Sequence, residues 1–147
     1  VAFMTSALKL KKRMTVLEIG TGSGYQAAVL SKLCRRVYSM ERHKSLLRHA
    51  EHVFEELVIT NITTRVGDGY KGWPETAPFD RIIVTAAAPN IPTELTEQLA
   101  DGGILVIPIG SADQQDVIRV TRDGDGFEYE SLLAVRFVPM VKGIAKD

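Results

Sequence analysis

A glycine-rich loop is the part of the chain whose residue types and spacing most clearly predict chemistry. Gly20, Gly22 and Gly24 alternate with other residues directly after the apolar run 16–19. Glycine lacks a Cβ atom, so it can adopt positive φ and lets a ligand approach the backbone closely. A helical pattern follows, and the free N–H groups at a helix N-terminus favour an anionic group. The loop is therefore predicted to bind a nucleotide-type ligand.

The spacing of this loop favours S-adenosylmethionine over a dinucleotide. The dinucleotide fingerprint G-x-G-x-x-G needs a third glycine at position 25, where this chain has Tyr25. The alternating form E-x-G-x-G-x-G suits a more compact ligand. The cofactor-binding residues expected in this stretch are Glu18, Gly20, Thr21, Gly22, Ser23, Gly24 and Tyr25.

Three carboxylates near the ends of predicted strands could also face the ligand. Glu41 follows Gly20 by 21 positions, where doubly wound sites place a carboxylate that accepts from a ribose diol, although a solvated charge or a helix cap would also fit. Asp68 lies between two glycines and could accept from an adenine amine or simply form a turn. Glu18 lies inside a predicted strand, where a charge is costly unless it is paired. Its partner could be the cofactor's ammonium group, a water molecule or a backbone donor.

Other candidate chemistry has less support. His49 and His52 are three residues apart on a predicted helix, but no carboxylate or cysteine pattern accompanies them. We therefore expect both histidines to face solvent, and no metal site. A serine hydrolase is disfavoured because the chain around Ser23 lacks the G-x-S-x-G motif. Tyr70 and Trp73 could either cover the cofactor or fill the core.

The surrounding elements predict an α/β fold. Strands are expected at 16–19, 37–40, 62–66, 82–85 and 104–109, with helices at 1–10, 25–35, 43–57 and 93–99. Two more strands, 116–122 and 127–138, flank an Asp-Gly-Asp-Gly turn and predict a hairpin. We expect a doubly wound, Rossmann-like parallel sheet with helices on both faces and a C-terminal antiparallel hairpin. The glycine loop, Glu41, 67–69 and 85–89 should then meet at one rim of the sheet.

Composition predicts one soluble domain covering residues 1–147. Of the 147 residues 45% are apolar, and 18 basic residues balance 18 acidic ones, so no net field attracts nucleic acid or a membrane. The helix 25–35 is expected to bury Ala28, Val29, Leu33 and Cys34. A single buried cysteine fits a reducing compartment, so we expect a cytoplasmic protein. We also expect a monomer with neither a nucleic-acid nor a membrane partner.

Several stretches together resemble the bacterial protein-L-isoaspartate O-methyltransferases. The glycine loop alone indicates only a class I methyltransferase, whereas Thr-Ala-Ala-Ala-Pro at 85–89 and Arg-Phe-Val-Pro at 136–139 are more specific. Further matches lie at 66–70, 72–73, 79–80 and 102–108. The resemblance implies methyl transfer from S-adenosylmethionine to the free carboxylate of L-isoaspartyl residues in damaged proteins and peptides, leaving S-adenosylhomocysteine. The methyl ester would then collapse through a succinimide, which allows return to a normal aspartyl linkage.

The resemblance also implies a larger set of site residues. Further cofactor contacts are expected at Glu41, Arg42, Gly67, Asp68, Gly69, Thr85 and Ala86. Acceptor contacts are expected at Ala87, Ala88, Pro89, Arg136, Phe137, Val138 and Pro139. A carboxylate acceptor is already ionised at neutral pH, so the reaction needs alignment and exclusion of water rather than a general base.

The chain also departs from the family pattern. Members carry a loop with a serine or threonine just before the segment that matches Val1, and this loop closes over the cofactor and contacts the substrate carboxylate. The catalytic hydroxyl is therefore expected to lie before Val1, and the chain is expected to be truncated, with weaker cofactor binding and slight turnover. Two alternatives stay open: a small-molecule methyltransferase with the same cofactor floor, and a non-catalytic S-adenosylmethionine-binding module. A nicotinamide oxidoreductase is disfavoured by Tyr25.

Overall fold

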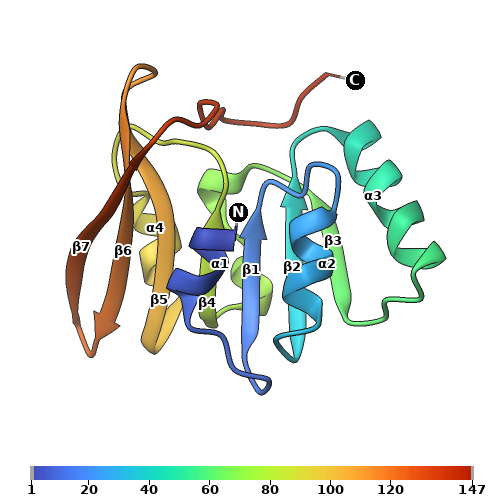
Figure 1. The fold of residues 1–147 in the computed structure, drawn as a ribbon, viewed down its shortest axis with the longest axis horizontal. Coiled ribbons are helices and arrows are strands. Elements are labelled where there is room, and N and C mark those ends of the chain that lie inside the picture. The colour runs from blue at the N-terminus through green and yellow to red at the C-terminus, as the bar shows by residue number, and fades with distance from the viewer. Residues whose placement is uncertain (1, 147) are drawn as a thin grey trace.

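The fold is built on one seven-stranded sheet, seen in a computed structural model that describes residues 2–146 (Figure 1). The strand order is β3-β2-β1-β4-β5-β6-β7; the first five pair in parallel, and β6 and β7 are antiparallel. The strands are β1 (Thr15–Ile19), β2 (Arg36–Glu41), β3 (Ile62–Val66), β4 (Phe79–Val84), β5 (Leu99–Gly110), β6 (Gln115–Asp123) and β7 (Gly126–Val135). This arrangement confirms the predicted doubly wound sheet with a C-terminal hairpin.

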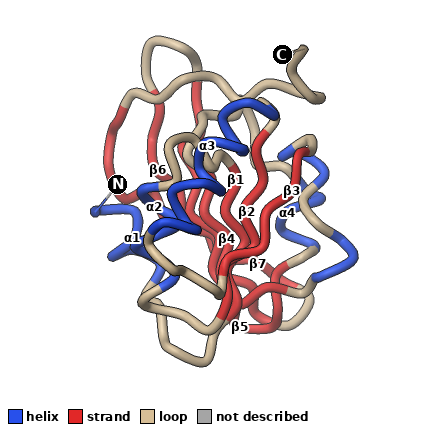
Figure 2. Tube along the Cα trace, turned by 90° about the vertical axis from the view of Figure 1, so that its right-hand side faces the viewer, coloured by secondary structure: helices blue, strands red, loops and turns tan. Residues whose placement is uncertain are grey.

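Helices cover both faces of the sheet. Figure 2 shows α1 and α2 on one side of the strands and α4 on the other. The first side carries α1 (Ala2–Leu8), α2 (Tyr25–Ser31) and α3 (Lys44–Glu56). The second side carries α4 (Thr93–Glu97) and the 3-10 turns η1 (Gly69–Lys71) and η2 (Pro74–Thr76). None of the helices within residues 2–146 is long and apolar enough to cross a membrane.

The central strands explain the division of the core into two layers. Val16 and Leu17 on β1 are both fully buried, and they belong to different apolar clusters on opposite faces. Ile83 and Ile82 on β4 divide in the same way. Successive side chains of a strand point to opposite faces, so a strand with helices on both sides buries apolar side chains on both faces. These two strands therefore anchor the rim residues that follow each of them.

The second helix differs from the prediction in length and in its buried face. It ends at Ser31 rather than Arg35, because the Ser31 hydroxyl donates to the Ala28 carbonyl and the next turns tighten to i→i−3 hydrogen bonds. Ala27 and Leu30 are buried, whereas Leu33 is 41% exposed. The predicted face is therefore wrong at Leu33 and only partly buried at Val29 and at Ala28, which packs against the core, while the predicted burial of Cys34 is confirmed.

The C-terminal segment 136–146 crosses the rim of the sheet instead of extending the last strand. The predicted strand 127–138 ends at Val135, where its partner strand begins at Gln115. Beyond it, the Ala87 N–H donates to the Val138 carbonyl at 2.8 Å, and the Met140 N–H donates back to Ala87 at 2.6 Å. Figure 1 shows this segment passing above the parallel strands toward α3. It therefore forms a roof over the carboxyl ends of the strands.

Candidate functional site

A cavity of about 430 Å³ lies beneath this roof, at the carboxyl ends of the parallel strands. Its volume is within the ordinary range for a small-molecule site. Parts of all four predicted rim stretches line it, which confirms that they converge. The lining residues are Ile19, Gly20, Gly22, Met40, Glu41, Arg42, His43, Leu46, Gly67, Gly69, Thr85, Ala86, Val138, Pro139, Met140 and Val141.

The glycine loop forms the floor of the cavity in a conformation that needs glycine. Gly20 has φ +101°, and its N–H donates to the Met40 carbonyl at 2.8 Å. A Cβ atom at Gly20 would lie 2.6 Å from the Thr85 hydroxyl, which donates to the Ile19 carbonyl. Gly22 has φ +53° with open space beside it. The loop is therefore closely packed on one side and open on the side where a ligand would lie.

Glu41 joins the glycine loop to the start of α3. It is the last residue of β2 and is only 7% exposed. Its Oε1 accepts from the Gly22 N–H at 2.9 Å, and its Oε2 accepts from the His43 N–H at 3.0 Å. Each carboxylate oxygen can accept more than one hydrogen bond, so Glu41 retains capacity for hydroxyl donors from a ligand. The structure thus holds this carboxylate at the cavity wall in a fixed orientation.

Asp68 forms a turn beside the cavity. Its Oδ1 accepts from the Tyr70 N–H at 3.0 Å and caps η1. The turn, one of the two possibilities that the sequence offered for Asp68, is therefore present. The flanking Gly67 and Gly69 line the cavity, whereas Asp68 is not among the lining residues. A contact between Asp68 and an adenine amine therefore stays a prediction.

Glu18 lies behind the glycine loop rather than in the cavity. Its carboxyl group is fully buried, and its Oε1 accepts from the Ser39 hydroxyl, which in turn shares a 2.6 Å hydrogen bond with the Thr21 hydroxyl. Its Oε2 has no hydrogen-bond partner among the described residues. Burial raises the pKa of Glu18 to about 8; the bond from Ser39 lowers it and the nearby Glu41 raises it. Ser39 and Thr21 thus connect the Glu18 carboxyl group to the glycine loop by hydrogen bonds.

A second cavity of about 300 Å³ continues the rim toward α1. It shares Gly20, Gly22 and Thr85 with the first cavity, so the two spaces meet at the glycine loop. Tyr25, which is 64% exposed, lies at this second space. The full lining is Met4, Gly20, Thr21, Gly22, Ser23, Tyr25, Gln26, Thr85 and Phe137. A ligand in the first cavity and a partner in the second would therefore be adjacent.

The residues predicted to contact an acceptor divide into two groups. Phe137 lines the second cavity, and Val138 and Pro139 line the first. The others line neither cavity: Ala87 and Ala88 are buried, with their backbones paired to the C-terminal segment and β5, and Pro89 and Arg136 are exposed. The Arg136 guanidinium instead donates to the Asp113 carbonyl at 3.3 Å.

Sequence reasoning missed several lining residues, most of them apolar side chains that carry no chemical signature. Most of them adjoin residues that were predicted, and this adjacency was the only available signal. Those residues are Ile19, Met40, His43, Leu46, Met140 and Val141 in the first cavity, and Met4 and Gln26 in the second. Gln115 was missed as well: its Oε1 accepts from the Phe137 N–H at 2.5 Å and fixes the start of the C-terminal segment.

The remaining candidates lie outside the cavities. His49 and His52 are both exposed, as predicted, and His52 Nε2 lies 2.9 Å from Glu56 Oε1. Across residues 2–146, no group of three or more His, Cys, Asp and Glu side chains could hold a metal ion. Trp73 is buried and meets the Tyr38 ring edge-on at 5.4 Å between centroids, so it fills the core rather than covering a ligand.

Comparison with known proteins places this geometry in one family. The sequence model described as protein-L-isoaspartate(D-aspartate) O-methyltransferase matches residues 1–145. A curated protein-L-isoaspartate O-methyltransferase from Parvibaculum lavamentivorans is 57% identical over the whole chain, which spans 68% of that protein. One from Maricaulis maris is 59% identical over 99% of the chain, and the chain again spans 68% of that protein.

Solved structures agree with the sequence matches. A protein-L-isoaspartate O-methyltransferase superimposes with a TM-score of 0.89 at 32% identity. The match covers 97% of this chain and 47% of the other protein's chain. A Plasmodium falciparum structure, described under the same activity and in complex with S-adenosyl-L-homocysteine, superimposes with a TM-score of 0.80 at 26% identity, over 97% of this chain and 73% of its own. The rim cavity, the strand order and the matches along nearly the whole length agree, and the chain belongs to the protein-L-isoaspartate(D-aspartate) O-methyltransferase family.

Proposed function

We propose that the chain transfers a methyl group from S-adenosylmethionine to the free carboxylate of L-isoaspartyl residues in damaged proteins and peptides. The single observation that carries this proposal is the rim cavity. There the open face of the glycine loop meets a nearly buried carboxylate, Glu41, in a chain of this family. Methyl transfer leaves S-adenosylhomocysteine, which is the ligand named for the Plasmodium falciparum structure.

The residues of the first cavity fit such a donor. Glu41 would accept from the ribose hydroxyls, since its two oxygens are oriented by backbone N–H groups and retain acceptor capacity. Gly67 and Gly69 would border the adenine, with Asp68 accepting from its amine. Gly20, Thr85 and Ala86 would border the methionine portion.

The chemistry requires little from ionisable side chains. The donor supplies a methyl group that its sulfonium already activates, and the acceptor carboxylate is ionised at neutral pH. The protein must align the two and exclude water. Val138, Pro139, Met140 and Val141 form an apolar roof over the first cavity, which suits exclusion of water. Phe137, which lines the second cavity, would border the acceptor. Pro89 and Arg136, which belong to the family motifs at 85–89 and 136–139, would border it as well.

Transfer of a radiolabelled methyl group to a matched pair of peptides tests the proposal. One peptide carries an isoaspartyl linkage and the other the normal aspartyl linkage at the same position. We expect label only in the isoaspartyl peptide, released as methanol by mild alkali because the product is a methyl ester. Label in both peptides at equal rates would contradict the proposed acceptor. Stable label in a small molecule would favour the small-molecule alternative, and saturable donor binding with no transfer to any acceptor would favour the binding module.

We also propose a cytoplasmic monomer that acts as one domain over residues 1–147 without a nucleic-acid partner. The buried Cys34, whose pKa burial raises to about 11, supports a reducing compartment. The equal numbers of basic and acidic residues support the absence of nucleic-acid binding. Size-exclusion chromatography with light scattering, with and without added DNA, would test the monomer and the lack of binding.

A further inference from the structure

The turn η1 forms a wall of the first cavity, and its position depends on close packing. Gly69, its first residue, lines the cavity and packs so closely on Ile19 that a Cβ atom would overlap the Ile19 side chain. The same Cβ would lie 3.1 Å from the Met140 side chain in the roof. Lys142 in the C-terminal segment also lies 5.8 Å from the Tyr70 ring. A displacement of η1 would therefore change the shape of the cavity.

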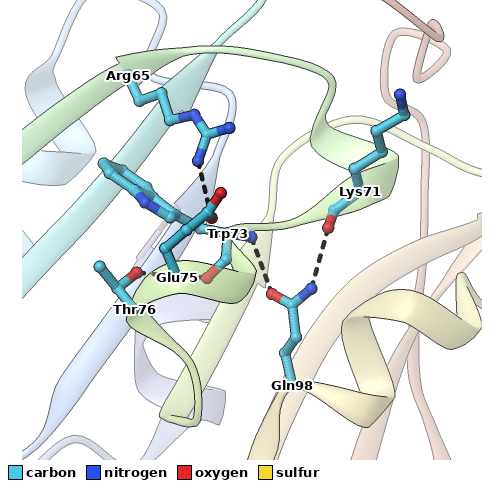
Figure 3. Close-up of polar contacts among 6 residues, drawn as sticks. All are labelled: Arg65, Lys71, Trp73, Glu75, Thr76 and Gln98. Carbon is cyan, nitrogen blue, oxygen red and sulfur yellow. Dashed lines mark hydrogen bonds and ion pairs between the residues drawn. The ribbon is translucent and has the colours of Figure 1, made fainter.

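One side chain outside the cavity holds the far end of this turn. Gln98 follows α4, and its Oε1 accepts from the Trp73 N–H at 2.9 Å while its Nε2 donates to the Lys71 carbonyl at 3.0 Å (Figure 3). Figure 3 shows the amide of Gln98 pointing at both backbone groups, which lie on either side of Gly72. Gly72 has φ +62°, and a Cβ atom there would overlap the Gln98 amide. The glutamine thus fits against a turn that only glycine adopts without strain.

The backbone of Gln98 extends the same connection. Its N–H donates to the Leu95 carbonyl in α4, and its carbonyl accepts from the Phe79 N–H at the start of β4. Gln98 therefore joins the cavity wall to α4 and to a central strand. The only other side chain within residues 2–146 that holds the backbone of η1 is Asp68, through Tyr70 at the opposite end. The wall is thus held at its two ends by two side chains of different elements.

We propose that Gln98 is a positioning residue for the nucleoside end of the methyl donor, acting through η1 without touching the ligand. The inference rests on the proposed function, because it takes the first cavity as the donor site. Loss of the two hydrogen bonds would let η1 leave its binding-competent position for part of the time. Apparent affinity falls in proportion to the competent fraction. Acceptor contacts and the chemical step should be unaffected once the donor is bound.

The test compares Gln98→Met, which keeps the length of the side chain, with Gln98→Glu and with Glu75→Gln. Gln98→Glu retains the acceptor for Trp73 and loses the donor to Lys71. Glu75→Gln is the matched control, because it breaks an exposed ion pair with Arg65 on the same segment, away from the cavity (Figure 3). Binding of S-adenosylhomocysteine and of the nucleoside fragment 5′-methylthioadenosine is measured by calorimetry, with circular dichroism as the test of folding.

We expect Gln98→Met to bind both ligands about tenfold more weakly, which lies below the limit of roughly 25-fold set by two lost hydrogen bonds that correspond to a factor of about five each. Glu75→Gln should stay within about twofold of the parent protein. Where methyl transfer is measured, Gln98→Met should raise the KM for the donor and leave kcat and the KM for the isoaspartyl peptide unchanged. Equal affinities of the parent protein and Gln98→Met would overturn the inference, as would weakening of S-adenosylhomocysteine without weakening of the nucleoside fragment.

Two further outcomes keep the test decisive. If Gln98→Met does not fold, Gln98→Glu decides: binding weakened threefold or more supports the inference, and unchanged binding overturns it. Failure of the parent protein to bind S-adenosylhomocysteine would instead contradict the proposed function. Failure of the inference and failure of the function it rests on therefore give different results.

Discussion

Replacing Glu18 with glutamine tests whether this buried carboxyl group is neutral in the folded protein. Glu18 is fully buried in the central strand β1, and burial raises its pKa from 4.5 to about 8. Glutamine has nearly the same shape and can still accept from the Ser39 hydroxyl. The substitution therefore removes the titration of Glu18 while preserving most of its packing.

The sign of the effect follows from the two protonation states. Between pH 4.5 and about 8 the unfolded chain has lost the Glu18 proton and the folded protein has kept it, so the free energy of unfolding falls as pH rises. The difference between pKa 4.5 and about 8 corresponds to ~5 kcal/mol over this window. Glu18→Gln lacks this contribution. It should lose less stability than the parent protein as pH rises from 5 to 8.

Urea denaturation at several pH values measures the effect. The free energy of unfolding of Glu18→Gln minus that of the parent protein is expected to rise by about 1 kcal/mol per pH unit between pH 5 and 7.5. Glu55→Gln, at an exposed position on α3, is the control and should parallel the parent protein. Parallel curves for Glu18→Gln and the parent protein would refute the reasoning, because they would mean that Glu18 titrates alike in the folded and unfolded states.

Three further predictions follow from particular contacts. Gly20→Ala should destabilise the protein by ~1–3 kcal/mol and weaken S-adenosylhomocysteine binding, because φ is +101° and the new methyl group would meet Thr85; unchanged melting and binding would contradict this. Leu30→Ala should cost ~2–5 kcal/mol in urea denaturation, because Leu30 is fully buried; a cost below 1 kcal/mol would contradict its place in the core. Cys34 should react slowly with a thiol reagent at pH 8 and rapidly after denaturation, because burial raises its pKa to about 11; equal rates would contradict its burial.

Strands were easier to predict than helix faces. Ile62–Val66 was predicted with its observed bounds, because Asn61 and Gly67 flank a continuous strand pattern. The face of α2 was predicted wrongly, because the pattern was extended over four residues, from Lys32 to Arg35, that do not continue the helix. With only two turns of helix, a change of end point changes which apolar residues define the face.

The site was predicted in position more fully than in its contacts. The carboxyl ends of parallel strands meet at one edge, so the convergence of Gly20, Glu41 and Thr85 followed from topology alone. The placement of Glu18 behind the loop could not be predicted, because it depends on Ser39 in the neighbouring strand. The role of Gln98 also left no signal, since a lone glutamine that accepts a hydrogen bond from a backbone N–H 25 residues away belongs to no motif.

A calorimetric titration of S-adenosylhomocysteine into the parent protein and into Glu41→Gln tests the central claim most directly. We expect saturable binding of one ligand per chain, weakened about tenfold in Glu41→Gln, because a charge-assisted hydrogen bond to the ribose contributes ~1.5–3 kcal/mol. An analogue without the two ribose hydroxyls should lose less affinity in Glu41→Gln than S-adenosylhomocysteine does, because only the loss of the acceptor for the Gly22 or His43 N–H then remains. Absence of saturable binding, or equal affinity of the two proteins for S-adenosylhomocysteine, would contradict the assignment of the rim cavity as the donor site.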